Sequence, residues 1–154
     1  LGDVYKRQKY KWPTLIVLTL LAMQLFPYGR DHANPPVAAE PAWDNPRTRA
    51  LFIRTCGDCH SHETDWPWYS HIAPVSWLVQ SDVDEGREHF NISMWGLQEK
   101  NEGDEAYEKF REGDMPPWFY LLPHPEAWLS DQEKSAFSQG LLATFGREQR
   151  EDDD

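Results

Sequence analysis

Hydrophobic residues form one long run near the start of the chain and only short periodic groups after it. The run extends from Trp12 to Tyr28, contains three polar residues, and follows Lys9 and Lys11. As a helix, its 17 residues would span about 25 Å, which is near the lower limit for the core of a bilayer. The pattern therefore predicts a signal-type membrane helix over residues 9–28, with aromatic residues at both ends where they suit the membrane interface.

Two interpretations of residues 9–28 stay open, an uncleaved signal anchor and a cleaved signal peptide. Cleavage needs small residues just after the apolar core, and residues 24–28 offer none. We favour the anchor, with the basic N-terminus in the cytoplasm and the rest exported. We leave residues 1–8 out of fold reasoning as an expected assembly artefact, because one reading frame of a common transposon sequencing adapter encodes Asp3–Gln8.

After this run, the pattern predicts a linker and then short helices. Residues 29–43 are rich in proline and alanine and read as an extended linker. Asn45 and Pro46 are typical of an N-cap and a first helical position, so we expect a helix from there into Cys56. Two further short helices are expected over residues 77–88 and 103–110.

The last helix has the clearest start signal. A Ser-x-x-Glu capping box at Ser130 opens an amphipathic stretch that we expect to end with Gly146 in the C′ position. We expect this helix to pack across the one that begins at Pro46. Residues 147–154 read as an acidic tail, and residues 44–146 read as a single domain.

Composition adds a constraint on cofactor and partner. Aromatic residues make up 14% of the chain, with 8 tryptophans, although the mean hydropathy is −0.74. Such a chain has little aliphatic bulk for its core, and a large, buried apolar cofactor would supply the missing mass. The net charge of −11 argues against nucleic acid as a partner and suits a protein with a basic docking face.

The chemistry centres on Cys56-Gly57-Asp58-Cys59-His60, the attachment pattern of a c-type haem. On one helical turn, both thiols can reach the vinyl groups of one porphyrin edge while His60 stands under the iron. A thioredoxin-like redox pair would need a surrounding βαβ pattern, and a zinc site would need two more ligands. A plain disulfide would leave His60 unexplained. We expect one covalent haem, with His60 as a metal ligand.

Other candidate cofactor-binding residues surround this motif in the sequence. Trp66, Trp68 and Tyr69 lie in a proline-interrupted loop that could wrap the haem face or form a packing cluster without cofactor contact. A carbonyl of this loop is expected to accept a hydrogen bond from the second nitrogen of His60. Arg87 is expected to meet either a haem propionate or a neighbouring carboxylate.

Met115 is the leading candidate for the second iron ligand. It lies in Gly113-Asp114-Met115-Pro116-Pro117, an irregular segment that is poorly explained as helical core. Its rivals are Met94, His71, His89 and His124.

From Gln24 to the last helix, the chain resembles the bacterial haem-binding-domain family of membrane-anchored, c-type cytochrome-like proteins. The resemblance is carried by Asn34-Pro35-Pro36-Val37, the attachment motif with Ser61, Thr64-Asp65-Trp66-Pro67-Trp68-Tyr69-Ser70, Ile72-Ala73-Pro74-Val75-Ser76-Trp77, Glu85-Gly86-Arg87, Asn91-Ile92-Ser93-Met94-Trp95 and Gly113-Asp114-Met115-Pro116-Pro117. It implies covalent haem c, with His60 proximal and Met115 distal.

We expect an all-α, class I cytochrome c-like haem domain of three to five short helices after an N-terminal membrane helix. The favoured function is electron transfer on the periplasmic side of the bacterial inner membrane, without enzymatic activity. Two alternatives are a haem-based sensor or peroxidase-like protein with a displaceable sixth ligand, and a haem-binding accessory module of a membrane complex.

Overall fold

The computed structural model describes residues 2–146, and over this range the chain is all-helical. No β-sheet forms there; Ala39 and Met94 make an isolated parallel bridge. The all-α prediction is confirmed, but six α-helices follow the first instead of three to five, because two of them are single turns. The α-helices are α1 (Gly2–Met23), α2 (Pro46–Thr55), α3 (Gly57–His60), α4 (Val75–His89), α5 (Ala106–Glu112), α6 (Trp118–Leu121) and α7 (Asp131–Phe145). Short 3-10 helices cover Trp68–His71, Gly103–Glu105 and Pro125–Ala127.

The described residues divide into two compact units. The first contains residues 2–32 and 66–82, and the second contains residues 33–65 and 83–146. Helix α4 starts in the first unit and ends in the second. The haem attachment motif lies in the second unit.

In the first unit, α1 presents apolar side chains to the surroundings. Leu15, Ile16, Val17, Leu18, Leu20 and Leu21 are between 45% and 60% exposed. Within the described residues, none of the helices has both the length and the hydrophobicity that a membrane crossing requires.

Gln24 ties the end of α1 to the 66–82 segment of the same unit. Its Nε2 donates to the carbonyl of Ala73 at 2.7 Å, and its Oε1 accepts from the N–H of Ala73 at 3.1 Å. Arg30 donates to the same Oε1 at 2.7 Å. Gly29 has φ +72°, and a Cβ there would lie 2.2 Å from the carbonyl oxygen of Ser76, so only glycine fits this approach.

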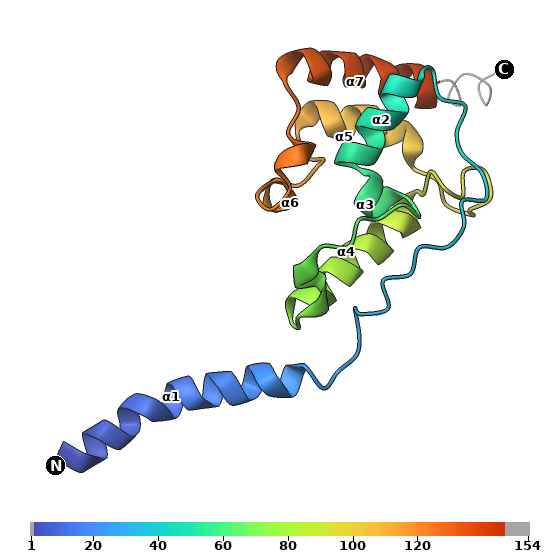
Figure 1. Cartoon of the computed structure of the whole chain (residues 1–154). Helices are drawn as coiled ribbons and strands as arrows, with labels where there is room; N and C mark the ends of the chain where they lie inside the picture. Colours follow the sequence, from blue (N-terminus) through green and yellow to red (C-terminus); the bar gives the residue numbers. More distant parts are fainter. Residues whose placement is uncertain (1, 147–154) are drawn as a thin grey trace. The chain divides into compact units, whose positions relative to one another are not determined.

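The core of the second unit is built mainly from phenylalanine. Helix α7 packs on both α2 and α5, and Figure 1 shows α2 crossing it while α5 runs beside it. Phe52 of α2 meets Phe137 and Phe145 of α7 at centroid distances of 6.4 and 6.0 Å, and all three rings are fully buried. A Cβ at Gly140 would lie 2.1 Å from Oγ1 of Thr48, so α2 and α7 approach closely. The predicted packing of these two helices is confirmed.

The predicted helix starts are confirmed by their caps. Asn45 Oδ1 accepts from the N–H groups of Arg47 and Thr48 at 2.9 and 3.0 Å. Ser130 and Glu133 form the full capping box of α7. The end of α7 differs from the prediction: Gly146 is the C-cap with φ −72°, not a left-handed C′ residue, because its N–H still bonds the carbonyl of Leu142 at 3.1 Å.

The latter part of the predicted linker packs against the second unit in extended form. The N–H groups of Ala38 and Ala39 donate to the carbonyl of Ser93 at 2.9 and 3.2 Å, and Trp95 N–H donates to the carbonyl of Ala39 at 3.2 Å. These bonds join residues 38–39 to the loop that follows α4, and this loop lies beside the attachment motif through the 2.9 Å bond from Ile92 N–H to the carbonyl of His60.

Candidate functional site

The attachment motif forms one tight helical turn directly after α2. Cys56 N–H continues the α2 hydrogen bonding to the carbonyl of Phe52 at 2.7 Å. The carbonyl of Cys56 then accepts from the N–H groups of Cys59 and His60 at 3.2 and 3.0 Å. Residues three and four apart on such a turn share a face, so both sulfurs and the imidazole belong to one face of α3.

His60 is held in the tautomer that a metal ligand needs. Its Nδ1 lies 3.1 Å from the carbonyl oxygen of Phe90, which can only accept, so Nδ1 carries the proton and Nε2 keeps its lone pair. The ring of Phe90 stacks on the imidazole at 4.3 Å. Burial lowers the pKa of His60, while the bond to the Phe90 carbonyl partly opposes that shift. The imidazole is therefore neutral at neutral pH.

The prediction of which residue supplies the carbonyl acceptor for His60 was wrong. We predicted it from the loop that contains Trp66 and Tyr69, but Phe90 supplies it from the residue after α4. The reason is that α4 itself packs against the attachment turn. A Cβ at Gly86 would lie 2.7 Å from the carbonyl oxygen of Cys59, so the last turn of α4 carries Phe90 to His60.

Both cysteines are free thiols in the structure. Burial raises the pKa of the Cys56 thiol to about 11, and the Thr55 hydroxyl, 3.3 Å from its sulfur, partly offsets that increase. Burial therefore favours the protonated thiol of Cys56 over the thiolate in the folded chain.

Arg87 fastens segments of the second unit to one another. Its Nε donates to the carbonyl of Ser61 at 2.9 Å and its Nη1 to the carbonyl of Ala33 at 3.1 Å. Its Nη2 donates to Asn34 Oδ1 at 3.2 Å and Thr64 Oγ1 at 3.0 Å. These acceptors are neither of the two partners expected from the sequence. A haem contact of Arg87 stays a prediction.

Met115 lies on the irregular segment that the sequence predicted, between α5 and α6. Gly113 caps α5 in the left-handed conformation with φ +82°, and the N–H of Met115 then donates to the carbonyl of Lys109 at 3.2 Å. Met115 is 42% exposed, so its side chain is not buried in the protein core. Its role as distal ligand stays a prediction.

Three of the rival ligands have side-chain partners. His71 packs its ring against His32 in the first unit, His89 pairs with Glu102, and His124 Nδ1 lies 2.9 Å from Glu126 Oε1. Met94 pairs with Ala39 through the backbone, which leaves its thioether out of the contact.

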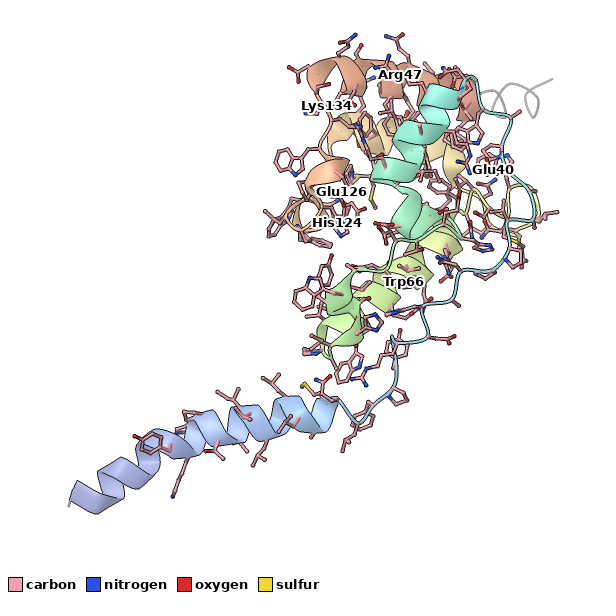
Figure 2. All side chains as sticks on the ribbon, viewed as in Figure 1. Glu40, Arg47, Trp66, His124, Glu126 and Lys134 are labelled. Carbon is pink, nitrogen blue, oxygen red and sulfur yellow. The ribbon has the colours of Figure 1, made fainter. Side chains whose placement is uncertain are left out.

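Trp66, Trp68 and Tyr69 belong to the first unit, whereas the attachment turn belongs to the second. Trp66, labelled in Figure 2, stacks on His32 at a centroid distance of 4.5 Å. Trp68 meets Tyr69 edge-on at 5.9 Å and is 75% exposed. These contacts agree with a packing cluster within the unit. A haem contact of the three rings stays a prediction.

Sequence reasoning missed two partners of the attachment turn. Phe90 lies 30 residues from His60, and Tyr120 donates its hydroxyl proton to Asp58 Oδ2 at 2.7 Å across 62 residues. Phe90 precedes the recognised Asn91-Ile92-Ser93 block, but nothing in that pattern marks a carbonyl acceptor. Tyr120 carries no motif at all.

The donor set fits a haem: two thiols and a neutral imidazole share one face of a turn, and the nitrogen opposite the buried hydrogen bond keeps its lone pair. An all-helical unit organised around such a turn defines a haem-binding protein. The family model described as "Haem-binding domain" matches residues 18–142, and the chain belongs to this family. No curated protein and no solved structure matches the chain.

Proposed function

We propose that this protein is a membrane-anchored electron carrier that holds one covalent haem c between His60 and Met115. The observation that carries the proposal is the attachment turn, in which Cys56, Cys59 and His60 share a face and the Phe90 carbonyl fixes the proton on Nδ1 of His60. Thioether bonds at the two cysteines would hold the group permanently, and Nε2 of His60 would bind the iron.

The bound group would supply one-electron redox chemistry, and the chain would tune and shield it. The hydrogen bond from His60 Nδ1 to Phe90 raises the electron-donating capacity of the imidazole. A thioether from Met115 would favour the ferrous state and raise the reduction potential. With both ligands bound, the iron would have no open position for substrate, which favours electron transfer over catalysis.

Two features favour an exported, membrane-anchored domain, although α1, over its described residues, does not combine the length and hydrophobicity that a membrane crossing requires. The apolar side chains of α1 from Leu15 to Leu21 are exposed, and Lys11 precedes them. We place the anchor in the bacterial inner membrane and the haem domain in the periplasm, where the net charge of −11 would guide a redox partner with a basic face. The full chain should stay in the membrane pellet after alkaline carbonate extraction; release into the supernatant would contradict the anchor.

Absorption spectra of the haem-loaded protein test the ligation. The oxidised wild type should be six-coordinate and low-spin, with the weak long-wavelength charge-transfer band typical of methionine bound to ferric haem. Met115→Ala should lose this band, and Met94→Ala, the matched control, should keep it. A high-spin wild type, or a band that survives in Met115→Ala, would contradict the ligand pair and favour a sensor or peroxidase-like protein.

A further inference from the structure

The middle residue Asp58 of the attachment motif has a partner that haem attachment does not explain. Its Oδ2 accepts from the hydroxyl of Tyr120 at 2.7 Å, and its Oδ1 accepts from the N–H of Asp65 at 2.9 Å. Its own carbonyl accepts from the hydroxyl of Thr64 at 2.7 Å. Asp58 is thus fixed by its neighbours and can act as a rigid acceptor for α6.

Tyr120 is held in place from its other side. The ring of His124 stacks on it at a centroid distance of 4.2 Å and an interplanar angle of 10°. His124 is itself buried. It lies beside Glu126 (Figure 2), and its Nδ1 is 2.9 Å from Glu126 Oε1. Burial, and then the charge of Asp58, raise the pKa of Tyr120, so its hydroxyl stays protonated and donates.

Met115 lies five positions before Tyr120 on a short, stiff connection. Pro116 and Pro117 follow it, and proline fixes φ, so little freedom remains before α6 begins at Trp118. The connection between Met115 and Tyr120 is therefore short, and two of its φ angles are fixed.

The other side of Met115 is anchored as well. The N–H groups of Asp114 and Met115 both donate to the carbonyl of Lys109 at the end of α5, at 3.0 and 3.2 Å. Helix α5 in turn packs on α7 through Phe110 and Phe137, whose rings meet at 4.9 Å. The methionine segment is thus held at two points, and one of them is the attachment motif itself.

We propose that the hydrogen bond between Tyr120 and Asp58 positions Met115 for iron ligation by fastening its segment to the turn that carries His60. This inference rests on the proposed His60 and Met115 ligation. Tyr120 and Asp58 are positioning residues: neither binds the iron. When Met115 leaves the iron together with its segment, the hydrogen bond between Tyr120 and Asp58 would be strained or broken.

Titration of the oxidised, haem-loaded full chain with imidazole tests the proposal, since imidazole competes with methionine for the sixth position. Tyr120→Phe removes only the donor and should bind imidazole about tenfold more tightly than wild type, the lower end of the range for a hydrogen bond to a charged group. Asp58→Asn keeps an oxygen acceptor but loses its charge, and should show a smaller shift in the same direction.

Tyr107→Phe is the matched control. The hydroxyl of Tyr107 contacts only Arg111 among the bonds described, at 3.4 Å in a solvent-exposed contact, and this variant should bind imidazole as wild type does. A Tyr120→Phe affinity equal to that of wild type would overturn the proposal even if the variant unfolds more easily, because a merely structural bond would change stability alone. If the wild type lacks the methionine band altogether, the ligation itself fails, and the positioning role fails with it.

Discussion

Gly86→Ala tests the close approach of α4 to the attachment turn. A Cβ at Gly86 would lie 2.7 Å from the carbonyl oxygen and 2.8 Å from the Cβ of Cys59, and this backbone cannot move away as a flexible side chain could. Gly57, within the same turn, is the matched control: its nearest contact would be Cδ1 of Ile53 at an ordinary 3.4 Å.

Both substitutions change the helix propensity in the same direction. They differ in the space that is available to the added Cβ. Alanine favours a helix interior over glycine by about 1 kcal/mol, a gain that applies in full at Gly86 and only in part at Gly57, the first residue of α3. Overpacking against Cys59 costs about 1–3 kcal/mol, and the rigid backbone contact puts Gly86→Ala in the upper part of that range. We expect Gly86→Ala to lower the free energy of unfolding by about 1–2 kcal/mol, while Gly57→Ala leaves it unchanged or raises it by up to about 1 kcal/mol.

Urea unfolding of the haem-loaded chain, followed by tryptophan fluorescence, measures the difference. The two variants should differ by about 2 kcal/mol, or about 30-fold in the unfolding constant. The midpoint should change while the slope stays the same, because the extent of unfolding is unaltered. If Gly86→Ala is as stable as Gly57→Ala, α4 does not lie against Cys59 as described, and the route by which Phe90 reaches His60 is wrong.

Two further predictions concern bonds that hold the second unit together. Arg87→Ala removes four hydrogen bonds from a half-buried guanidinium and should loosen residues 33–34, which limited proteolysis would detect as new cleavage before α2; an unchanged pattern would contradict this fastening role. The backbone N–H of Ser130, and then Arg54, lower the pKa of Glu133 to about 2. Its contribution to stability is present above the unfolded pKa, about 4.3, and is lost as the pH falls towards 2. Glu133→Gln should therefore flatten the pH dependence of unfolding in that window, and parallel curves would refute the prediction.

Local signals in the sequence predicted the elements that they control. Asn45 with Pro46 and the box at Ser130 determine where α2 and α7 begin, because caps act on residues within one turn. The attachment turn and the irregular segment at Met115 are likewise local patterns. The local conformation of both segments follows from residues that are adjacent in the chain.

Tertiary partners could not be predicted in the same way. The carbonyl that holds His60 belongs to Phe90, and every residue has a carbonyl, so no residue type marks this acceptor. The same holds for Arg87, two of whose acceptors are carbonyls, although carboxylates and propionates were the natural expectation. The hydrogen bond from Tyr120 to Asp58 depends on the position of α6. A helix of one turn has too short a hydrophobic pattern for its position to be predicted from the sequence.

The central claim is that Cys56 and Cys59 carry a covalent haem, and the intact mass of the denatured protein tests it most directly. The chain expressed with haem-maturation machinery should retain the mass of one haem after acid–acetone extraction, with the pyridine haemochrome spectrum of a haem bearing two thioethers. Cys56→Ser/Cys59→Ser should lose the haem under the same treatment. A wild-type chain that releases its haem into the acetone would contradict covalent attachment and leave a non-covalent haem protein in its place.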